Sequence, residues 1–243
     1  MTTHVRPQRW LVVNADDFGQ SPGVNRGVIT AHERGIVTSA SLMVRWPAAA
    51  EAAAYARVNR RLGVGLHVDL GEWAYRNGSW VCLYDVVPVD DAAAVAAEVA
   101  RQVEAFRDLV GRDPTHLDSH QHIHREPPTR DVVLHWGLQL GVPVRHFTPD
   151  VAYCGDFYGQ SGKGEPYPAA IRPKTLVGVL HSLPCGVTEL ACHPGLGGDI
   201  DSMYRDERAF EVRALSDVSV RAVICDEGIE LISFGCAPIV SGA

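Results

Sequence analysis

The sequence predicts an α/β fold in a single domain over residues 1–243, arranged as a (β/α) barrel of the TIM type, regular or distorted. Short apolar runs alternate along the chain with helix-like stretches, which is the pattern of βα units. Several of these runs end in polar residues, as strands do when their carboxyl ends line the mouth of a barrel. A length of 243 residues suits one barrel, and no internal repeat or low-complexity linker divides the chain.

The predicted strands are short apolar runs bounded by polar residues or glycine. They cover residues 11–14, 39–44, 64–70, 116–120, 144–147, 188–192 and 230–234. Residues 91–110 place apolar side chains at helical spacing between an acidic start and Gly111, which predicts an amphipathic helix. The same pattern predicts a helix over residues 208–227. Residues 150–173 are rich in Gly, Tyr and Pro, show no periodicity, and are expected to form a lid or binding loop.

The composition is that of a globular protein, with 46% hydrophobic and 21% charged residues. The formal net charge is -7 and no run is rich in Lys and Arg, which argues against nucleic acid or an anionic membrane surface as a partner. We therefore expect a small or neutral substrate. No stretch of about 18 apolar residues could span a bilayer, and the polar first residues lack the apolar core of a signal peptide.

The six cysteines are scattered and include no C-x-x-C pair, which predicts neither a disulfide framework nor a thiolate metal site. We expect mostly buried free thiols and a cytoplasmic location. The sequence does not specify an oligomeric state, and a homodimer is the commonest assembly of soluble chains.

The most informative segment is His-Leu-Asp-Ser-His-Gln-His-Ile-His at residues 116–124. In an extended strand every second side chain lies on one face, so we expect that face to carry His116, Asp118, His120, His122 and His124. Imidazole is the commonest protein ligand of divalent transition metals, and a nearby carboxylate can ligate or orient a histidine. The segment therefore predicts a metal site. The alternative interpretation is a solvated loop that happens to be rich in histidine.

Three other segments place polar residues at the ends of predicted strands. Asp16 and Asp17 follow an apolar strand, His67 and Asp69 share one strand face, and His193 precedes a Pro-Gly turn. Taken singly, each has an ordinary explanation: a turn with solvated acids, a hydrogen-bonded core histidine, or a simple turn. Because the carboxyl ends of parallel strands meet at one mouth, we expect these groups to lie together.

Together these segments resemble the YdjC-like family of carbohydrate deacetylases, also called the ChbG/HpnK family. The resemblance is carried by NADDFG at 14–19, GIVTSASLM at 35–43, GLH at 65–67, HLDSHQHIH at 116–124 and CHPG at 192–195. Their order and spacing cover nearly the whole chain. The resemblance implies a (β/α) barrel-like fold and one divalent metal ion. It also implies hydrolysis of an N-acetyl group on an amino sugar, typically a chitooligosaccharide such as diacetylchitobiose.

Transferred by position, the resemblance makes Asp17, His67 and His120 the metal ligands. It makes Asp16 the general base and His193 the general acid. Elementary chemistry agrees, because amide hydrolysis needs an activated water, a stabilised oxyanion and a proton for the departing amine. Two adjacent carboxylates raise each other's pKa, but a metal on Asp17 would let Asp16 stay ionised and accept a proton.

The remaining polar residues of the histidine run receive supporting roles. We expect Asp118 to orient a histidine, and His122 and His124 to bind sugar hydroxyls or secondary ligand positions. Two imidazoles and one carboxylate favour Zn²⁺, Co²⁺, Ni²⁺ or Mn²⁺ over Mg²⁺, which prefers oxygen ligands. Mg²⁺ remains an alternative because the resemblance includes family members with Mg²⁺. The metal is therefore expected to be Zn²⁺ or Mg²⁺.

Two segments depart from the family pattern, namely Arg45-Trp46 and residues 68–73, and we expect them to shape the substrate pocket. Sugar rings are hypothesised to stack on aromatic side chains. The candidates are Trp46, Trp73, Trp80 and Tyr153.

Two other functions remain open at this stage. A metal-dependent phosphoesterase would need cationic groups for its phosphate, and Lys163, Arg172 and Lys174 near the irregular segment could supply them. A non-catalytic protein that binds metal or sugar would not need Asp16 and His193 in addition to the three ligands.

Overall fold

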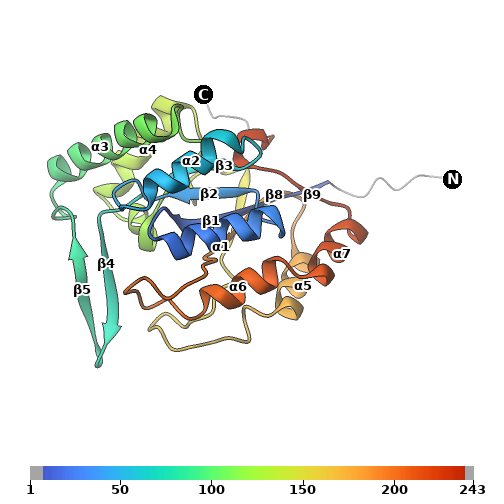
Figure 1. Cartoon of the computed structure of the whole chain (residues 1–243). Coiled ribbons are helices and arrows are strands. Elements are labelled where there is room, and N and C mark those ends of the chain that lie inside the picture. Colours follow the sequence, from blue (N-terminus) through green and yellow to red (C-terminus); the bar gives the residue numbers. More distant parts are fainter. Residues whose placement is uncertain (1–7, 239–243) are drawn as a thin grey trace.

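The computed structural model describes residues 8–238, in which strands and helices alternate (Figure 1). The strands are β1 (Arg9–Phe18), β2 (Ser39–Leu42), β3 (Gly63–Val68), β4 (Gly71–Arg76), β5 (Ser79–Asp85), β6 (Leu117–Ser119), β7 (Val151–Cys154), β8 (Gly186–Cys192) and β9 (Ile229–Leu231). The helices are α1 (Pro22–Glu33), α2 (Ala49–Val58), α3 (Ala92–Val110), α4 (Thr129–Leu140), α5 (Pro173–Ser182), α6 (Arg208–Leu215) and α7 (Val218–Asp226). Two 3₁₀ segments, η1 (His120–Arg125) and η2 (Phe234–Cys236), complete them.

The main sheet is parallel throughout and runs in the order β6-β3-β2-β1-β8-β7, with β9 paired to the start of β1. The sheet is curled, and its path runs from β6 at one edge to β7 at the other. The predicted α/β fold is therefore confirmed, in its distorted barrel form. Because every pairing is parallel, the carboxyl ends of β1, β3, β6 and β8 lie on the same side of the sheet.

The central strands are buried on both faces, which explains why they read as nearly continuous apolar runs. Every residue of β1 from Leu11 to Phe18 is buried, and so is every residue of β3. Helices α1 and α2 cover one face of the sheet (Figure 1). Ser21 caps α1 by accepting a hydrogen bond from the backbone N–H of Val24.

The helix predicted over residues 91–110 is confirmed as α3. The Asp91 side chain accepts hydrogen bonds from the backbone N–H groups of Ala93 and Ala94, at 3.0 and 3.1 Å. Gly111 ends the helix with a φ of 75°, a left-handed conformation that glycine adopts without a steric penalty. The apolar side chains at helical spacing are buried, as the pattern indicated.

Several predicted elements are wrong in extent, and residues 150–173, expected to be irregular, contain strand β7. The single helix over residues 208–227 is two helices, because the Asp217 side chain accepts the backbone N–H of Ser219 at 2.8 Å and starts α7. In place of a strand over 144–147, only Val144 pairs with β6, and the chain then turns at His146, whose φ is 67°. The strand predicted over 230–234 is β9, which ends at Leu231, and a 3₁₀ turn follows.

The hairpin of β4 and β5 is an element that we did not predict. It forms a separate antiparallel sheet that projects beyond the body of the molecule (Figure 1). Its two-residue turn holds Asn77 at a φ of 51° and Gly78 at 86°. Positive φ at both central residues fits the tight hairpin turn for which Asn-Gly is the strongest sequence signal. The Asn-Gly dipeptide at 77–78 could therefore have predicted this hairpin from the sequence.

The cysteines also differ from expectation, because four of the six free thiols are exposed and only Cys192 is buried. All six are free thiols in the structure. Within residues 8–238, no helix is both long and apolar enough to cross a membrane.

Candidate active site

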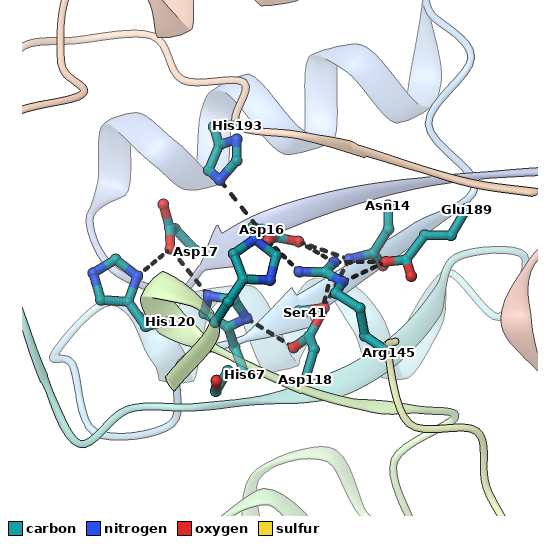
Figure 2. A network of polar contacts seen from close by, with 12 residues as sticks. Asn14, Asp16, Asp17, Ser41, His67, Asp118, His120, Arg145, Glu189 and His193 are labelled. Carbon is teal, nitrogen blue, oxygen red and sulfur yellow. Dashed lines mark hydrogen bonds and ion pairs between the residues drawn. The ribbon is translucent and has the colours of Figure 1, made fainter. Parts of the chain in front are cut away.

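Four strands deliver polar side chains to one point beyond their carboxyl ends (Figure 2). Asp16 and Asp17 come from β1, His67 from β3 and Asp118 from β6, while His193 directly follows β8. Neighbouring residues of a strand normally face opposite sides. The register between β1 and β2 shifts between Ala15 and Phe18, and Asp17 has a φ of 64°. This irregularity lets both aspartates reach the same buried site.

Asp17, His67 and His120 form a compact group with metal-ligand chemistry. Each is buried and offers one ligand atom, and the three atoms lie within 4.8 Å of one another. Oδ1 of Asp17 is 3.3 Å from Nε2 of His67 and 3.1 Å from Nδ1 of His120. One carboxylate and two imidazoles are a ligand set that suits divalent transition metals.

The outer nitrogen of each of these histidines faces a carboxylate. Nδ1 of His67 is 2.8 Å from Oδ1 of Asp118, and Nε2 of His120 is 3.6 Å from Oε2 of Glu72. Outer carboxylates orient metal-binding histidines. Asp118 does so through a hydrogen bond, whereas Glu72 faces His120 beyond hydrogen-bond distance. Burial opposes the imidazolium form, but Asp118 and Asp17 outweigh it and raise the pKa of His67 to about 10. The residues present therefore fit a divalent cation.

Asp16 lies beside this group and is held by a guanidinium. Arg145 donates to both of its oxygens at 2.7 Å, and Asn14 donates to Oδ1 at 2.8 Å. Burial raises the pKa of Asp16, but the charge and hydrogen bonds of Arg145 outweigh this and leave it below the usual value. Nε2 of His193 is 3.8 Å from Oδ2 of Asp16. Asp16 is therefore an ionised carboxylate in a fixed orientation, and His193 is its neighbour on one side.

Arg145 also binds two further buried carboxylates. Its NH2 group lies 2.8 Å from Oδ2 of Asp118 and 2.6 Å from Oε1 of Glu189. Burial raises the pKa of Glu189 to about 7 even though Arg145 acts in the opposite direction. One guanidinium therefore joins the base candidate to the carboxylate that orients His67 (Figure 2).

His193 sits among aromatic rings with one side toward Asp16. Its ring centroid is 5.4 Å from that of Tyr158 and 5.3 Å from that of Tyr204. Burial lowers the pKa of His193 to about 4, although Asp16 and Asp17 act to raise it. Its backbone N–H donates to Glu211, which fixes the position of the strand end.

These residues open into a cavity of about 570 Å³. This volume is in the range of sites for small organic molecules. The wall includes Asp16, Asp17, His67, Glu72, Trp80, His120, His122, Tyr153, Phe157, Tyr158, His193, Tyr204 and Arg208. The combination of polar groups at the base and aromatic side chains around them fits a small polar ligand with flat apolar faces.

The sequence matches the model of the YdjC-like protein family over residues 10–226, which is most of the chain. The chain belongs to the YdjC-like family. It is 31% identical to a chitooligosaccharide deacetylase of Salmonella dublin, covering 93% of this chain and 98% of that protein. It is also 31% identical to a carbohydrate deacetylase of Geobacillus stearothermophilus, covering 93% of this chain and 97% of that protein.

Two solved structures share the fold of this chain. A protein of Enterococcus faecalis V583, described as a candidate cellobiose-phosphate cleavage protein, superposes with a TM-score of 0.72 at 24% identity, covering 93% of this chain and 98% of that one. A family 4 carbohydrate esterase of Streptomyces lividans in complex with acetate superposes with a TM-score of 0.55 at 14% identity, covering 98% of this chain and 100% of that one. At these identities the likeness concerns the fold, which for this YdjC-like chain is the curled parallel sheet.

The histidine run of this YdjC-like chain does not form one continuous strand, so the expected single face is wrong. Strand β6 covers only Leu117–Ser119, and the backbone then turns through positive φ angles of 51° at Gln121 and 53° at His122. His116 stays in the interior, stacked on Phe234 with centroids 4.1 Å apart and within 3.0 Å of the Ser41 hydroxyl.

The last two histidines of the run are separated by this turn. His122 lines the cavity, with Nδ1 3.0 Å from Nε2 of His146 and Nε2 3.3 Å from the Tyr153 hydroxyl. His124 is buried outside the cavity wall, between the Ser119 hydroxyl at 2.6 Å and the Arg145 carbonyl at 3.1 Å. His124 therefore has a structural role, whereas His122 lines the cavity.

The two departures from the family pattern have different outcomes. Arg45 and Trp46 do not line the cavity but both contact the Asp69 carboxylate, at 3.3 and 3.1 Å. Glu72 does line it and faces His120. Trp73 is likewise away from the cavity wall, so Trp80 and Tyr153 remain from the four aromatic candidates.

Sequence reasoning missed three charged partners, Arg145, Glu189 and Arg208, and it placed Glu72 in the segment that shapes the pocket without predicting its contact with His120. For two of them a signal existed. Arg145 is a charged residue in an apolar run, and Glu189 lies inside β8, where every neighbour from Val187 to Cys192 is buried. A charge within such a strand is found only when it is paired. Glu72 and Arg208 carried no comparable local signal.

Proposed function

We propose that the protein is a metal-dependent hydrolase that removes the N-acetyl group from an amino sugar, with a chitooligosaccharide such as N,N′-diacetylchitobiose as substrate. The observation that carries this proposal is the juxtaposition of an Asp-His-His group with an Arg-held aspartate and a histidine in one cavity. The names of the two relatives, at 31% identity over nearly their whole length, support the substrate class.

Asp17, His67 and His120 would hold the divalent ion. When bound there, the ion supplies Lewis-acid polarisation of the acyl oxygen and lowers the pKa of a bound water. The ligand set favours Zn²⁺ or a similar transition metal, with Mg²⁺ as the alternative. Metal analysis of protein purified without added metal, followed by restoration of activity with each ion, decides between them.

Asp16 acts as the general base that takes a proton from the attacking water. Arg145 keeps the carboxylate ionised and fixes its plane through two hydrogen bonds of 2.7 Å. Asp16 can therefore present a lone pair to the water without rotating away from it. The same guanidinium holds Asp118, so the base and the orientation of His67 depend on one side chain.

His193 acts as the general acid on the leaving-group side. Burial lowers its pKa to about 4, so the imidazole is neutral before reaction. Negative charge that develops beside it during amide cleavage raises its proton affinity. The imidazole can then carry a proton between Asp16, whose Oδ2 lies 3.8 Å away, and the departing nitrogen.

The cavity wall supplies the contacts for the sugar. Trp80 lines the cavity and is 55% exposed, which leaves its ring face available for stacking on a pyranose. Tyr153 and His122 are hydrogen-bonded to each other and form a polar part of the cavity wall where sugar hydroxyls can bind. Trp80→Ala should raise KM for the disaccharide, and Val81→Ala, the next residue on the hairpin, serves as the control.

The first test is release of acetate and free primary amine from N,N′-diacetylchitobiose, before and after chelation and with each metal restored. Metal-dependent release supports the proposal. Absence of release from protein that binds a stoichiometric metal would overturn the substrate class, and p-nitrophenyl phosphate then tests for a phosphoesterase. Lys163, Arg172 and Lys174 do not line the cavity, and Arg208, which does line it, is already bound to Asp17.

The roles of the protein groups need a separate variant. Asp16→Asn should retain the metal but lose at least about 10²-fold in kcat, the effect expected of a general base. Asp108→Asn on the exposed side of α3 is the matched control. Near-normal turnover by Asp16→Asn would remove this residue from the mechanism.

A further inference from the structure

Arg208 is a buried cation in direct contact with the metal-ligand group, and it has no role in the mechanism above. It is the first residue of α6, and its side chain is 4% exposed. Its NH2 group donates to Oδ2 of Asp17 at 2.6 Å, and its Nε donates to the Tyr204 carbonyl at 2.7 Å. A cation so close to a candidate cation site needs an explanation.

The two oxygens of Asp17 have separate partners. Oδ1 faces His67 and His120, at 3.3 and 3.1 Å, whereas Oδ2 faces the Arg208 guanidinium at 2.6 Å. These contacts on both oxygens hold the plane of the carboxylate, so that Oδ1 faces the histidines and Oδ2 faces Arg208. A carboxylate can bind a metal through one oxygen or two. The bond to Arg208 occupies the second oxygen.

The guanidinium is held from several directions, so the contact is part of the fold. The Tyr204 ring lies under it, with the guanidinium carbon 5.8 Å from the ring centroid. The aliphatic part of Arg208 packs on Gly195, where an added Cβ would lie 3.0 Å from Cδ of Arg208. Its NH1 group is buried without a hydrogen-bond partner among the described residues, and Arg208 is one of the residues that line the cavity.

We propose that Arg208 restricts Asp17 to a single metal-binding oxygen and so leaves more of the ion's coordination sphere free of protein. This inference rests on the metal site of the proposed function. The arginine competes with the ion for the same carboxylate, so it weakens metal binding while keeping the site open for reaction. Arg208 is thus a positioning residue. Its removal should strengthen metal binding, whereas removal of a residue that merely supports the site should weaken metal binding.

The test compares the wild-type protein with Arg208→Gln and Arg208→Lys. Metal affinity is measured by competition for Zn²⁺ or Co²⁺ with a chromophoric chelator, and turnover is measured on N,N′-diacetylchitobiose. Arg208→Gln should bind the ion about tenfold more tightly, the scale of one charge-assisted hydrogen bond, while kcat falls at least about tenfold. Arg208→Lys keeps the charge and should bind close to the wild-type affinity.

Arg205→Gln is the matched control, because Arg205 is exposed and pairs with Asp206 at 2.9 Å. Equal or weaker metal binding by a folded Arg208→Gln variant overturns the inference. If this variant does not fold, a crystal structure of the metal-loaded wild type decides. Asp17 bound through one oxygen, with Arg208 still on the other, supports the inference, and ligation through both oxygens overturns it. A wild-type protein that binds no metal overturns the proposed function instead.

Discussion

Replacing Arg145 with methionine should lower the free energy of unfolding by about 3–5 kcal/mol, the usual cost of removing one partner from a buried ion pair. The Arg145 side chain is 1% exposed and lies against three carboxylates that are no more than 3% exposed: Asp16, Asp118 and Glu189. Methionine preserves much of the packing volume, so the loss reports the charge and its hydrogen bonds. The metal-free protein is the sample, which keeps the result independent of any ligand.

The magnitude follows from how much charge remains after the substitution. Glu189 has a pKa of about 7 and can take up a proton, which limits the cost at that position. Asp16 and Asp118 stay ionised at neutral pH because Arg145 lowers the pKa of each, and without it both are left without their main counter-charge. At about 2–4 °C per kcal/mol for a chain of this size, the melting temperature should fall by roughly 6–20 °C.

Urea unfolding followed by circular dichroism measures this change. Arg107→Met is the matched control, because Arg107 makes two exposed ion pairs and its loss should cost less than about 1 kcal/mol. Adding Asp16→Asn to Arg145→Met should recover about 1–3 kcal/mol, since it removes one of the two carboxylates left charged without a counter-ion. A loss below about 1 kcal/mol in Arg145→Met, or strictly additive effects in the double variant, would refute the reasoning.

Three further predictions concern neighbouring groups. Glu189→Gln should flatten the pH dependence of stability, because burial raises the pKa of Glu189 from 4.5 to about 7 and the native state therefore loses stability as pH rises through that window. Unfolding midpoints at about pH 5 and pH 8 measure it, and an unchanged slope would contradict the assignment. Glu72→Gln should weaken metal binding about 10–100-fold through the orientation of His120. His120→Ala should abolish binding, and stoichiometric metal in that purified variant would remove it from the ligand set.

The fold was predictable where local patterns decide it. Strands buried on both faces produce unbroken apolar runs, and α3 has both an acidic cap and a terminal glycine. The errors arose where a side chain competes with the backbone. Asp217 starts a new helix in the middle of a periodic run, and Thr148 takes the backbone N–H of Val144 at 2.9 Å and ends the strand there. Such bonds are not visible in hydrophobic periodicity.

The candidate site was predictable to a similar extent. Residues at the ends of strands could be placed together because parallel strands share one carboxyl edge, and the structure does bring Asp16, Asp17, His67 and His193 to one cavity. The groups that orient them come from elsewhere. Arg208 reaches Asp17 across 191 residues of sequence, which no local pattern encodes.

The hairpin of β4 and β5 carries two residues of the cavity wall, Glu72 and Trp80, and it yields a last prediction. Glu72 at its base faces His120, and Trp80 near its tip lines the cavity, so a change in hairpin position should alter metal affinity and KM together. Gly78→Val tests this, because a φ of 86° disfavours a β-branched residue by about 1–3 kcal/mol while its Cβ would meet no neighbour.

Gly111→Val is the matched control for Gly78→Val. Gly111 has a φ of 75° and equally open surroundings, but it ends α3 away from the cavity. Both variants therefore carry similar backbone strain, and only the hairpin variant should weaken metal binding and raise KM for the disaccharide. Equal effects from the two glycines would mean that the site responds to overall stability. A hairpin variant with normal affinity and normal KM would mean that Glu72 and Trp80 keep their places without the tight turn.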